Sequence, residues 1–167
     1  MNRPVLSVIL ALMVLAGLAG CPGYTMDPLH RADVKTVAVP VFHSREFRRQ
    51  LEFALTKELV KAIELKTSYK VVQDRANADT EILGEIIDLQ APVLTEELDT
   101  ESRQEVQVTL KVKFEWKDLR SGEVLASMSL SDSGTYAMAV GQTLDSATTQ
   151  AVRRVARRIV EAMEEPW

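Results

Sequence analysis

The feature that most limits the fold is a strict alternation of apolar and polar side chains over residues 105–117. Every even position in this stretch is apolar, and every odd position is polar. Successive side chains of a strand point to opposite faces of its sheet, so the pattern predicts a long strand with one buried and one wet face. We expect Val112, Phe114 and Trp116 to share the buried face and to pack against helices.

A hairpin is predicted directly after this strand. Residues 119–122 (LRSG) supply the turn, and Gly122 suits a backbone with positive φ. The alternation then continues with apolar side chains at Val124, Ala126, Met128 and Leu130. We therefore expect a second strand that lies antiparallel to the first.

Two amphipathic helices are predicted from apolar side chains at three- and four-residue steps. The first covers residues 46–66, and its apolar positions are Phe47, Leu51, Ala54, Leu55, Leu59, Ala62 and Ile63. The second covers residues 144–163 and ends before Pro166. Its apolar positions are Leu144, Ala147, Ala151, Val152, Val155, Ile159, Val160 and Met163.

Three further strands are predicted from β-branched and apolar runs at residues 34–41, 69–72 and 80–89. The element order is then β-α-β-β-β-β-α. The simplest packing that buries all the apolar stripes is an α+β fold. In it, two amphipathic helices pack on one face of a four- to five-stranded mixed, mostly antiparallel sheet.

The N-terminus has the pattern of a secretory signal. Arg3 precedes an apolar run over residues 5–16, and residues 18–21 (LAGC) match the bacterial lipobox. The thiol of Cys21 would accept a diacylglyceryl group, followed by an N-acyl chain on the new N-terminus. We expect residues 1–20 to be removed, residues 21–33 to form a lipidated tether, and residues 34–167 to form a single domain. Pro22 in place of Asp favours the outer membrane, by resemblance to known lipoproteins.

Charge and cysteine content exclude several classes of protein. The net charge is −4, so the chain lacks the basic excess of a nucleic-acid-coating protein, and no nucleic-acid partner is expected. Cys21 is the only cysteine, which excludes an intrachain disulfide and a multi-cysteine metal site. We expect no cofactor apart from the covalent lipid on Cys21, and no metal.

No catalytic constellation is apparent, and we expect no enzymatic activity. His43 and Ser44 are adjacent, and the favoured interpretation is a surface turn in which Ser44 caps the first helix. An acidic loop over residues 96–105 is expected to be solvated, with a weak calcium site as the alternative. Its carboxylates are Glu96, Glu97, Asp99, Glu101 and Glu105.

Two groups of basic residues are candidate binding sites for a phosphorylated lipid headgroup or a partner. The first is a lysine row on the wet face of the long strand: Lys111, Lys113 and Lys117. The second is an arginine cluster on the second helix: Arg153, Arg154, Arg157 and Arg158. An ordinary solvated surface is the alternative for both. The lysine row is the better candidate because neither helix need cover it.

Several segments of the mature chain, taken together in their order and spacing, resemble the LptE family of lipopolysaccharide-assembly lipoproteins. The matching segments are 21–24 (CPGY), 35–42 (KTVAVPVF), 58–60 (ELV), 69–72 (YKVV), 78–79 (AD), 84–86 (GEI), 118–125 (DLRSGEVL) and 151–160 (AVRRVARRIV). The resemblance implies two helices on a four-stranded sheet at the cell outer membrane. It also implies a β-barrel translocon partner (LptD-like), which such a protein plugs and helps to assemble, and contact with lipopolysaccharide.

A second resemblance keeps an alternative open. Residues 36–40 (TVAVP), the helix and residues 69–72 (YKVV) also resemble CsgG-like secretion-channel lipoproteins and the amino-terminal domain of TolB. A channel subunit would need membrane-spanning hairpins with an apolar outer face. The strand at residues 105–117 is long enough, but its wet face is highly charged.

Overall fold

The long alternating segment forms an interior strand of a mixed sheet. The computed structural model describes residues 31–44, 50–91, 105–137 and 143–164. In these residues the strands are β1 (Thr36–Ala38), β2 (His43–Ser44), β3 (Lys70–Val72), β4 (Thr80–Gln90), β5 (Glu105–Asp118) and β6 (Val124–Ala137). The helices are α2 (Leu51–Lys66) and α3 (Leu144–Glu161), with a short 3-10 turn η1 (Arg75–Asn77).

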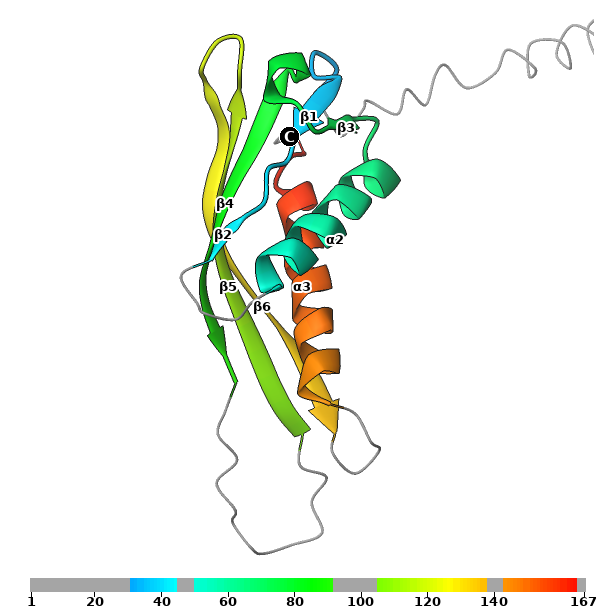
Figure 1. Cartoon of the computed structure of the whole chain (residues 1–167), viewed down its shortest axis with the longest axis vertical. Coiled ribbons are helices and arrows are strands. Elements are labelled where there is room, and N and C mark those ends of the chain that lie inside the picture. Colours follow the sequence, from blue (N-terminus) through cyan, green and yellow to red (C-terminus); the bar gives the residue numbers. More distant parts are fainter. Residues whose placement is uncertain (1–30, 45–49, 92–104, 138–142, 165–167) are drawn as a thin grey trace, which may run out of the picture.

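The sheet has a parallel part and an antiparallel part (Figure 1). Its main strand order is β3-β1-β4-β5-β6, with β1 parallel to both β3 and β4. Strands β4, β5 and β6 then form an antiparallel meander. The predicted fold class, two helices on a mixed sheet, is confirmed. The described sheet has six strands rather than four or five, because β2 pairs with β4 beyond the end of β1.

The predicted division of β5 into two faces is confirmed where its side chains are described. The even residues from Val108 to Trp116 are buried, while Lys111 and Lys113 on the opposite face are exposed. Phe114 lies between Gly84 on β4 and Met128 on β6. We call these two sides of the sheet the covered face and the open face.

Strand β6 differs from the prediction at both ends. It continues past Leu130 to Ala137, and it keeps its pairing with β5 over this whole length. At its start the register shifts opposite Trp116 and Lys117, so Val124 pairs with Lys117 of the open face and is 47% exposed. The expectation that Val124 continues the buried stripe is therefore wrong, because a β-bulge reverses the alternation there.

The start of the first helix also differs. Gln50 has a φ of 88°, a left-handed conformation that does not belong to a right-handed helix, and α2 begins at Leu51 rather than at residue 46. Ser44 lies in β2, so its predicted role as the helix cap is wrong. Ala54 is exposed instead of buried, and Phe47 lies outside the described residues.

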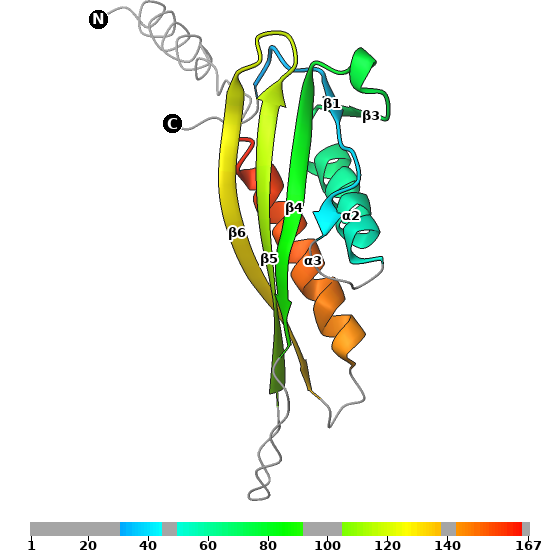
Figure 2. The ribbon, with the colours of Figure 1, turned by 60° about the vertical axis from the view of Figure 1, so that its left-hand side comes forward.

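Both helices lie on the covered face and run in the same direction (Figures 1 and 2). Two ion pairs link them: Glu58 with Arg153 at 3.6 Å, and Lys66 with Glu161 at 3.5 Å. From the first ion pair to the second, the chain advances by eight residues on both helices, so the two helices run parallel. Helix α3 begins with a capping box in which Thr143 and Ser146 satisfy each other's backbone N–H groups.

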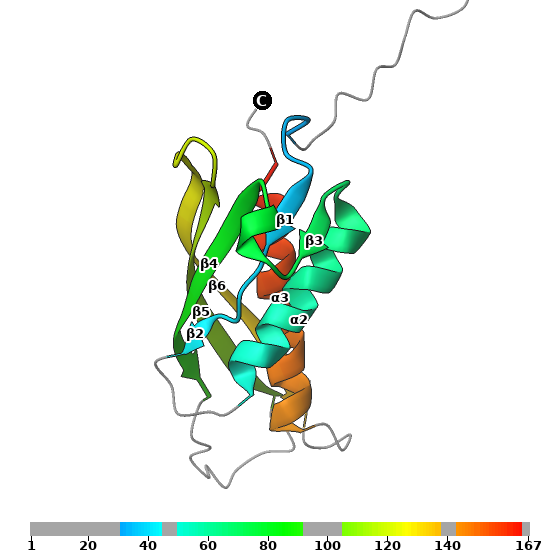
Figure 3. The ribbon, with the colours of Figure 1, turned by 45° about the horizontal axis from the view of Figure 1, so that its top comes forward.

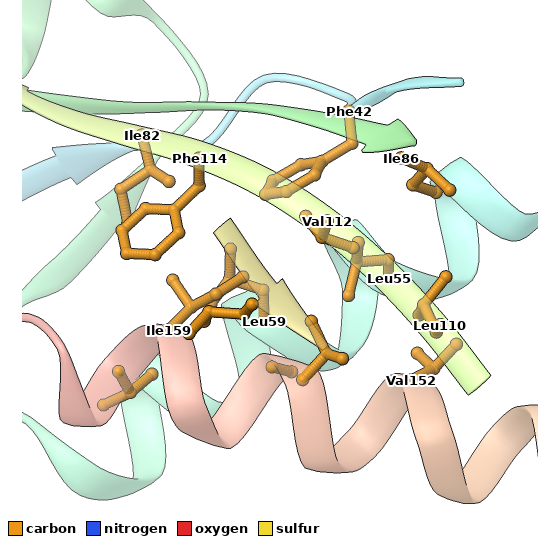
Figure 4. Close-up of a cluster of buried hydrophobic side chains, with 14 of the residues drawn as sticks. Phe42, Leu55, Leu59, Ile82, Ile86, Leu110, Val112, Phe114, Val152 and Ile159 are labelled. Atoms are coloured by element: carbon orange, nitrogen blue, oxygen red, sulfur yellow. The ribbon is translucent and has the colours of Figure 1, made fainter. Parts of the chain in front are cut away.

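The core lies between the helices and the covered face (Figure 4). Phe114 and Ile82 from the sheet meet Leu59 and Ile159 from the two helices. Phe42, which lies between β1 and β2, rests on Gly84, where any Cβ would collide with the aromatic ring. The tight approach of Phe42 explains why a glycine stands in the middle of β4.

Candidate functional site

The lysine row lies on the open face, which neither helix covers. Lys111 and Lys113 are exposed and Lys117 is half-buried, and within the described part of the chain none of them has an ion pair or hydrogen bond. The row nevertheless stands beside carboxylates, because the register pairs these lysines with acidic residues of β4. The pairs are Lys111 with Asp88, Lys113 with Glu85, and Lys117 with Glu81. The open face therefore carries both signs of charge.

One of these carboxylates is already engaged. Glu81 is buried, and its Oε2 lies 3.1 Å from Nε of Arg75 on the 3-10 turn. On the other side of the lysine row, β6 places Ser131 opposite Lys111 and Ser129 opposite Lys113, but it places the exposed Val124 opposite Lys117. Lys111 and Lys113 therefore border short hydroxyl side chains, whereas Lys117 borders an apolar one.

The arginine cluster has a different environment from the lysine row. Arg154 donates to the backbone carbonyl of Ser133 at 2.8 Å, and Arg158 donates to that of Ser131 at 2.9 Å. Arg153 lies 3.6 Å from Glu58. Arg157 is exposed and has no ion pair or hydrogen bond with any other residue in the described ranges. Two of the four arginines thus fasten α3 to the edge of the sheet.

A polar cluster fastens residues 33–36, at the start of β1, to the other end of the sheet. Oδ2 of Asp79 accepts hydrogen bonds from the amide N–H groups of Lys35 and Thr36 and from the Thr36 hydroxyl, each at 3.0 Å. Arg120, in the turn between β5 and β6, lies 3.8 Å from Asp79 and donates to the carbonyl of Asp33 at 3.2 Å. We call these residues the Asp79 cluster. Figure 3 shows how β1 enters the sheet here, between β3 and β4.

The hydrogen bonds of this cluster stabilise the ionised carboxylate. The Lys35 amide is the main group that holds the pKa of Asp79 below its ordinary value of 3.8, followed by the donors of Thr36 and the charge of Arg120. The amides of Ser121 and Arg120 likewise lower the pKa of Asp118, which caps the turn. Both ionised carboxylates therefore stabilise the local fold, since backbone N–H groups already donate hydrogen bonds to them.

Sequence reasoning missed a groove between the first halves of the two helices. It has a volume of about 980 Å³ and is lined by Leu51, Ala54, Leu89 and Val152, among others. Phe53 at the rim is 59% exposed. Leu144, predicted to be core, also lies at this rim and is 39% exposed. The available signal was Phe53 itself, a large aromatic residue outside the predicted apolar stripe of its helix.

The groove can accept an apolar chain or side chain from a partner. Its apolar floor is bordered by charged and polar groups, including Lys57, Glu58 and Asp145. Concave apolar surfaces of this size with a few polar groups are typical of ligand sites.

Several predicted features fall outside the described ranges or remain isolated. Cys21 and the acidic loop up to residue 104 are not among the described residues. His43 is exposed on β2. The described residues contain no group of three or more His, Cys, Asp or Glu side chains that could hold a metal ion. None of the described helices is both long and apolar enough to cross a membrane.

The fold defines a class of small α+β modules that recurs in bacterial proteins. A protein of the PelC dodecamer from Paraburkholderia phytofirmans is 14% identical, with a TM-score of 0.58 over 81% of this chain and 93% of that chain. A hypothetical protein from Chlamydia trachomatis is also 14% identical, with a TM-score of 0.56 over 76% of this chain and 94% of that chain. An uncharacterized lipoprotein B from Nitrosomonas europaea is 14% identical as well, with a TM-score of 0.51 over 77% and 81%. These likenesses establish the fold.

A match to a protein-family model identifies the family of the chain. The LptE (lipopolysaccharide-assembly) family model matches residues 34–163, which covers most of the chain and all the described helices and strands. The chain belongs to this family, and the resemblance predicted from its segments is confirmed. Among curated protein sequences, none matches this chain significantly.

Proposed function

We propose that this chain is an outer-membrane lipoprotein that works in lipopolysaccharide transport and assembly with a β-barrel partner of the LptD type. The observation that carries the proposal is the LptE family match over residues 34–163. The N-terminal signal and lipobox support it, because they would place the domain on a membrane outside the cytoplasm. The role is non-enzymatic: plugging and assembling the barrel, and contacting lipopolysaccharide.

Lipidation of Cys21 would anchor the domain through the tether. Each buried methylene of an acyl chain contributes about 0.8 kcal/mol, so that two or more chains hold a protein on a bilayer stably. The tether joins the domain at the Asp79 cluster, where residues 33–36 are fastened to β4 and to the turn between β5 and β6. The anchor would thereby fix which end of the sheet faces the membrane.

The first test replaces the lipid acceptor. The Cys21→Ser protein should be unprocessed or released from the membrane, because the thiol that takes the diacylglyceryl group is gone. Membrane fractionation of wild-type and variant cells measures this directly. Equal membrane retention of the two proteins would contradict the lipoprotein proposal.

We assign the contact with lipopolysaccharide or the barrel wall to the open face, with Lys111, Lys113 and Lys117 as the cationic groups. Two observations favour this lysine row over the arginine cluster. The helices cover the other face of the sheet, and the lysines have no ion pairs within the described ranges. In the arginine cluster, Arg154 and Arg158 already bond to β6. Lysine ammonium groups pair with phosphates as point charges.

The second test compares two charge reversals of equal size. The double variant Lys111→Glu/Lys113→Glu should weaken lipopolysaccharide binding or barrel co-purification and leave the fold intact, because both side chains are exposed. The matched control is Arg153→Glu/Arg157→Glu, which spares the two arginines that hold β6. If the control abolishes binding and the lysine variant does not, the site lies on α3.

A second candidate function is that of a CsgG/TolB-like envelope lipoprotein, which acts as a secretion-channel or scaffold subunit. The structural neighbour PelC is a dodecamer, and this favours the candidate. Affinity purification of the membrane-extracted lipoprotein separates the two functions. Recovery of an outer-membrane barrel supports the lipopolysaccharide-assembly role, whereas a large assembly of identical subunits without a barrel supports the channel or scaffold role.

A further inference from the structure

The two edges of the sheet are protected to different degrees. The edge formed by β3 is only three residues long and carries the exposed Lys70. The opposite edge, β6, is 14 residues long. Short and charged edge strands discourage pairing with other chains, whereas a long edge with few charges invites it. The edge of β6 is therefore the place to look for an interface.

The hydrogen bonds of the second half of β6 show which of its residues face away from β5. The carbonyls of Ser131 and Ser133 accept from Arg158 and Arg154, and the Ser133 N–H donates to Asp132 at 2.8 Å. In an antiparallel pair the N–H and C=O of one residue point the same way, and the direction alternates along the strand. The odd residues of β6 after the bulge therefore direct their backbone groups off the edge.

Among the described residues, no arginine caps the first half of the edge in this way. Ser127 and Ser129 are exposed, and in the described ranges their outward backbone groups have no hydrogen-bond partner. Residues 124–131 (VLASMSLS) contain no charge, no proline and no glycine. Met128 on the covered side is 40% exposed, although Phe114, the residue opposite it on β5, is buried. Such a segment is a ready template for another strand.

We infer that, in copies that are not bound to a barrel partner, this half-edge pairs with the same segment of a second copy, antiparallel about a two-fold axis at Ser127. In this register Ser127 meets its own copy, Leu125 meets Ser129, and Ala126 meets Met128. Odd residues then pair with odd residues, so the free backbone groups of both copies bond to each other. Even residues also meet even residues, which puts Met128 beside Ala126 of the other copy on the covered side.

Charge at the ends of the segment favours a second copy as the occupant. The two-fold register brings Glu123 of one copy toward Ser131 of the other, where the guanidinium of Arg158 is held. Glu123 is exposed, and its carboxylate has no partner within the described part of the chain. The arginine caps also stop the pairing at Ser131. A two-fold contact uses the same surface on both subunits and closes at a dimer.

A disulfide test reports the axis directly. Two residues in a hydrogen-bonded antiparallel pair have Cα atoms about 5.5 Å apart, which lies within the disulfide range. The full-length Ser127→Cys protein should form a disulfide dimer when its membranes are mildly oxidised. Gln107→Cys, exposed on β5 away from the edge, and the wild-type chain with only Cys21 are the controls. Linkage to a barrel protein instead of a second copy would overturn the inference.

A proline test separates edge pairing from folding. Ser127→Pro removes an N–H that points off the edge, so the ladder to β5 stays intact and only the second copy is lost. Ser127→Ala keeps this N–H and is the matched control. In sedimentation of the detergent-extracted protein free of a barrel, wild type and Ser127→Ala should be dimers, whereas Ser127→Pro should be a monomer whose circular dichroism still shows the folded domain. A monomeric wild type, or a dimeric Ser127→Pro protein, would overturn the inference.

Discussion

The two faces of β5 show how one strand serves two purposes. On the covered face Phe114 and Trp116 are almost fully buried against the helices. On the open face Lys111 and Lys113 point into solvent beside the carboxylates of β4. Burial of apolar area stabilises the fold, while exposed charges contribute little to its stability and are available to a partner. The covered face therefore determines the structure, and the open face is left for function.

The sharpest test of this division uses neighbouring residues on the two faces. Phe114→Ala should lower the free energy of unfolding by about 3–5 kcal/mol, because it removes a buried ring and leaves a cavity. Lys113→Ala should change the same quantity by less than about 0.5 kcal/mol, as is usual for surface substitutions. Denaturant unfolding of both variants measures the difference. Similar midpoints would mean that the two faces do not differ as the structure shows.

A smaller effect is expected at Gly134, on the covered face of β6. A Cβ at this position would collide with the backbone carbonyl of Ala147 at the start of α3. Gly134→Ala should therefore displace the helix and cost about 1–3 kcal/mol, the usual range for overpacking.

The control for this substitution lies on the other face of the same strand. Ser131→Ala changes an exposed side chain and keeps the carbonyl that Arg158 binds, so its midpoint should stay near that of the wild type. A tolerated Gly134→Ala, with a midpoint equal to that of Ser131→Ala, would mean that α3 packs less closely on β6 than described.

The Asp79 cluster tests whether polar contacts outside the core are as weak as those on the open face. Asp79→Asn removes the negative charge from three donors and should lower stability at neutral pH by about 1–3 kcal/mol, the typical value of charge-assisted hydrogen bonds. This cost should be smaller than that of Phe114→Ala and larger than that of Lys113→Ala.

The pH dependence of this cluster has a definite sign. The folded pKa of Asp79 is lowered below 3.8, so its stabilisation is fully present above that value and is lost as the pH falls through the folded pKa. Thermal melts from pH 7 down to pH 2 should show the gap between wild type and Asp79→Asn closing in the acid range. A gap that stays constant with pH would contradict the assignment of the effect to the carboxylate charge.

Much of the architecture could be predicted because its signals are local. A period of two fixed β5, periods of three and four marked α2 and α3, and the order of elements then favoured helices on one face. Errors came where the periodicity alone is ambiguous. The left-handed conformation of Gln50 delays α2, and the bulge at Val124 reverses the alternation in β6.

The candidate sites were less predictable because they depend on contacts between distant residues. The row of lysines on one face could be derived from the alternation, but the acidic neighbours Glu85 and Asp88 depend on the register of β4 against β5. The groove also depends on how α2 and α3 meet, and no spacing within either helix encodes that.

By itself, the sequence determined the alternating strand, the two amphipathic helices, the lipobox at Cys21 and the resemblance to a family. Only the tertiary structure decided that Arg154 and Arg158 cap the carbonyls of Ser133 and Ser131, that the helices run parallel, and that no described residue caps the first half of the β6 edge. The physical reason is the separation along the sequence of the residues that interact. Burial patterns follow from which side chains avoid water along a few turns of chain, whereas hydrogen bonds across 21 and 27 residues exist only after the elements have packed.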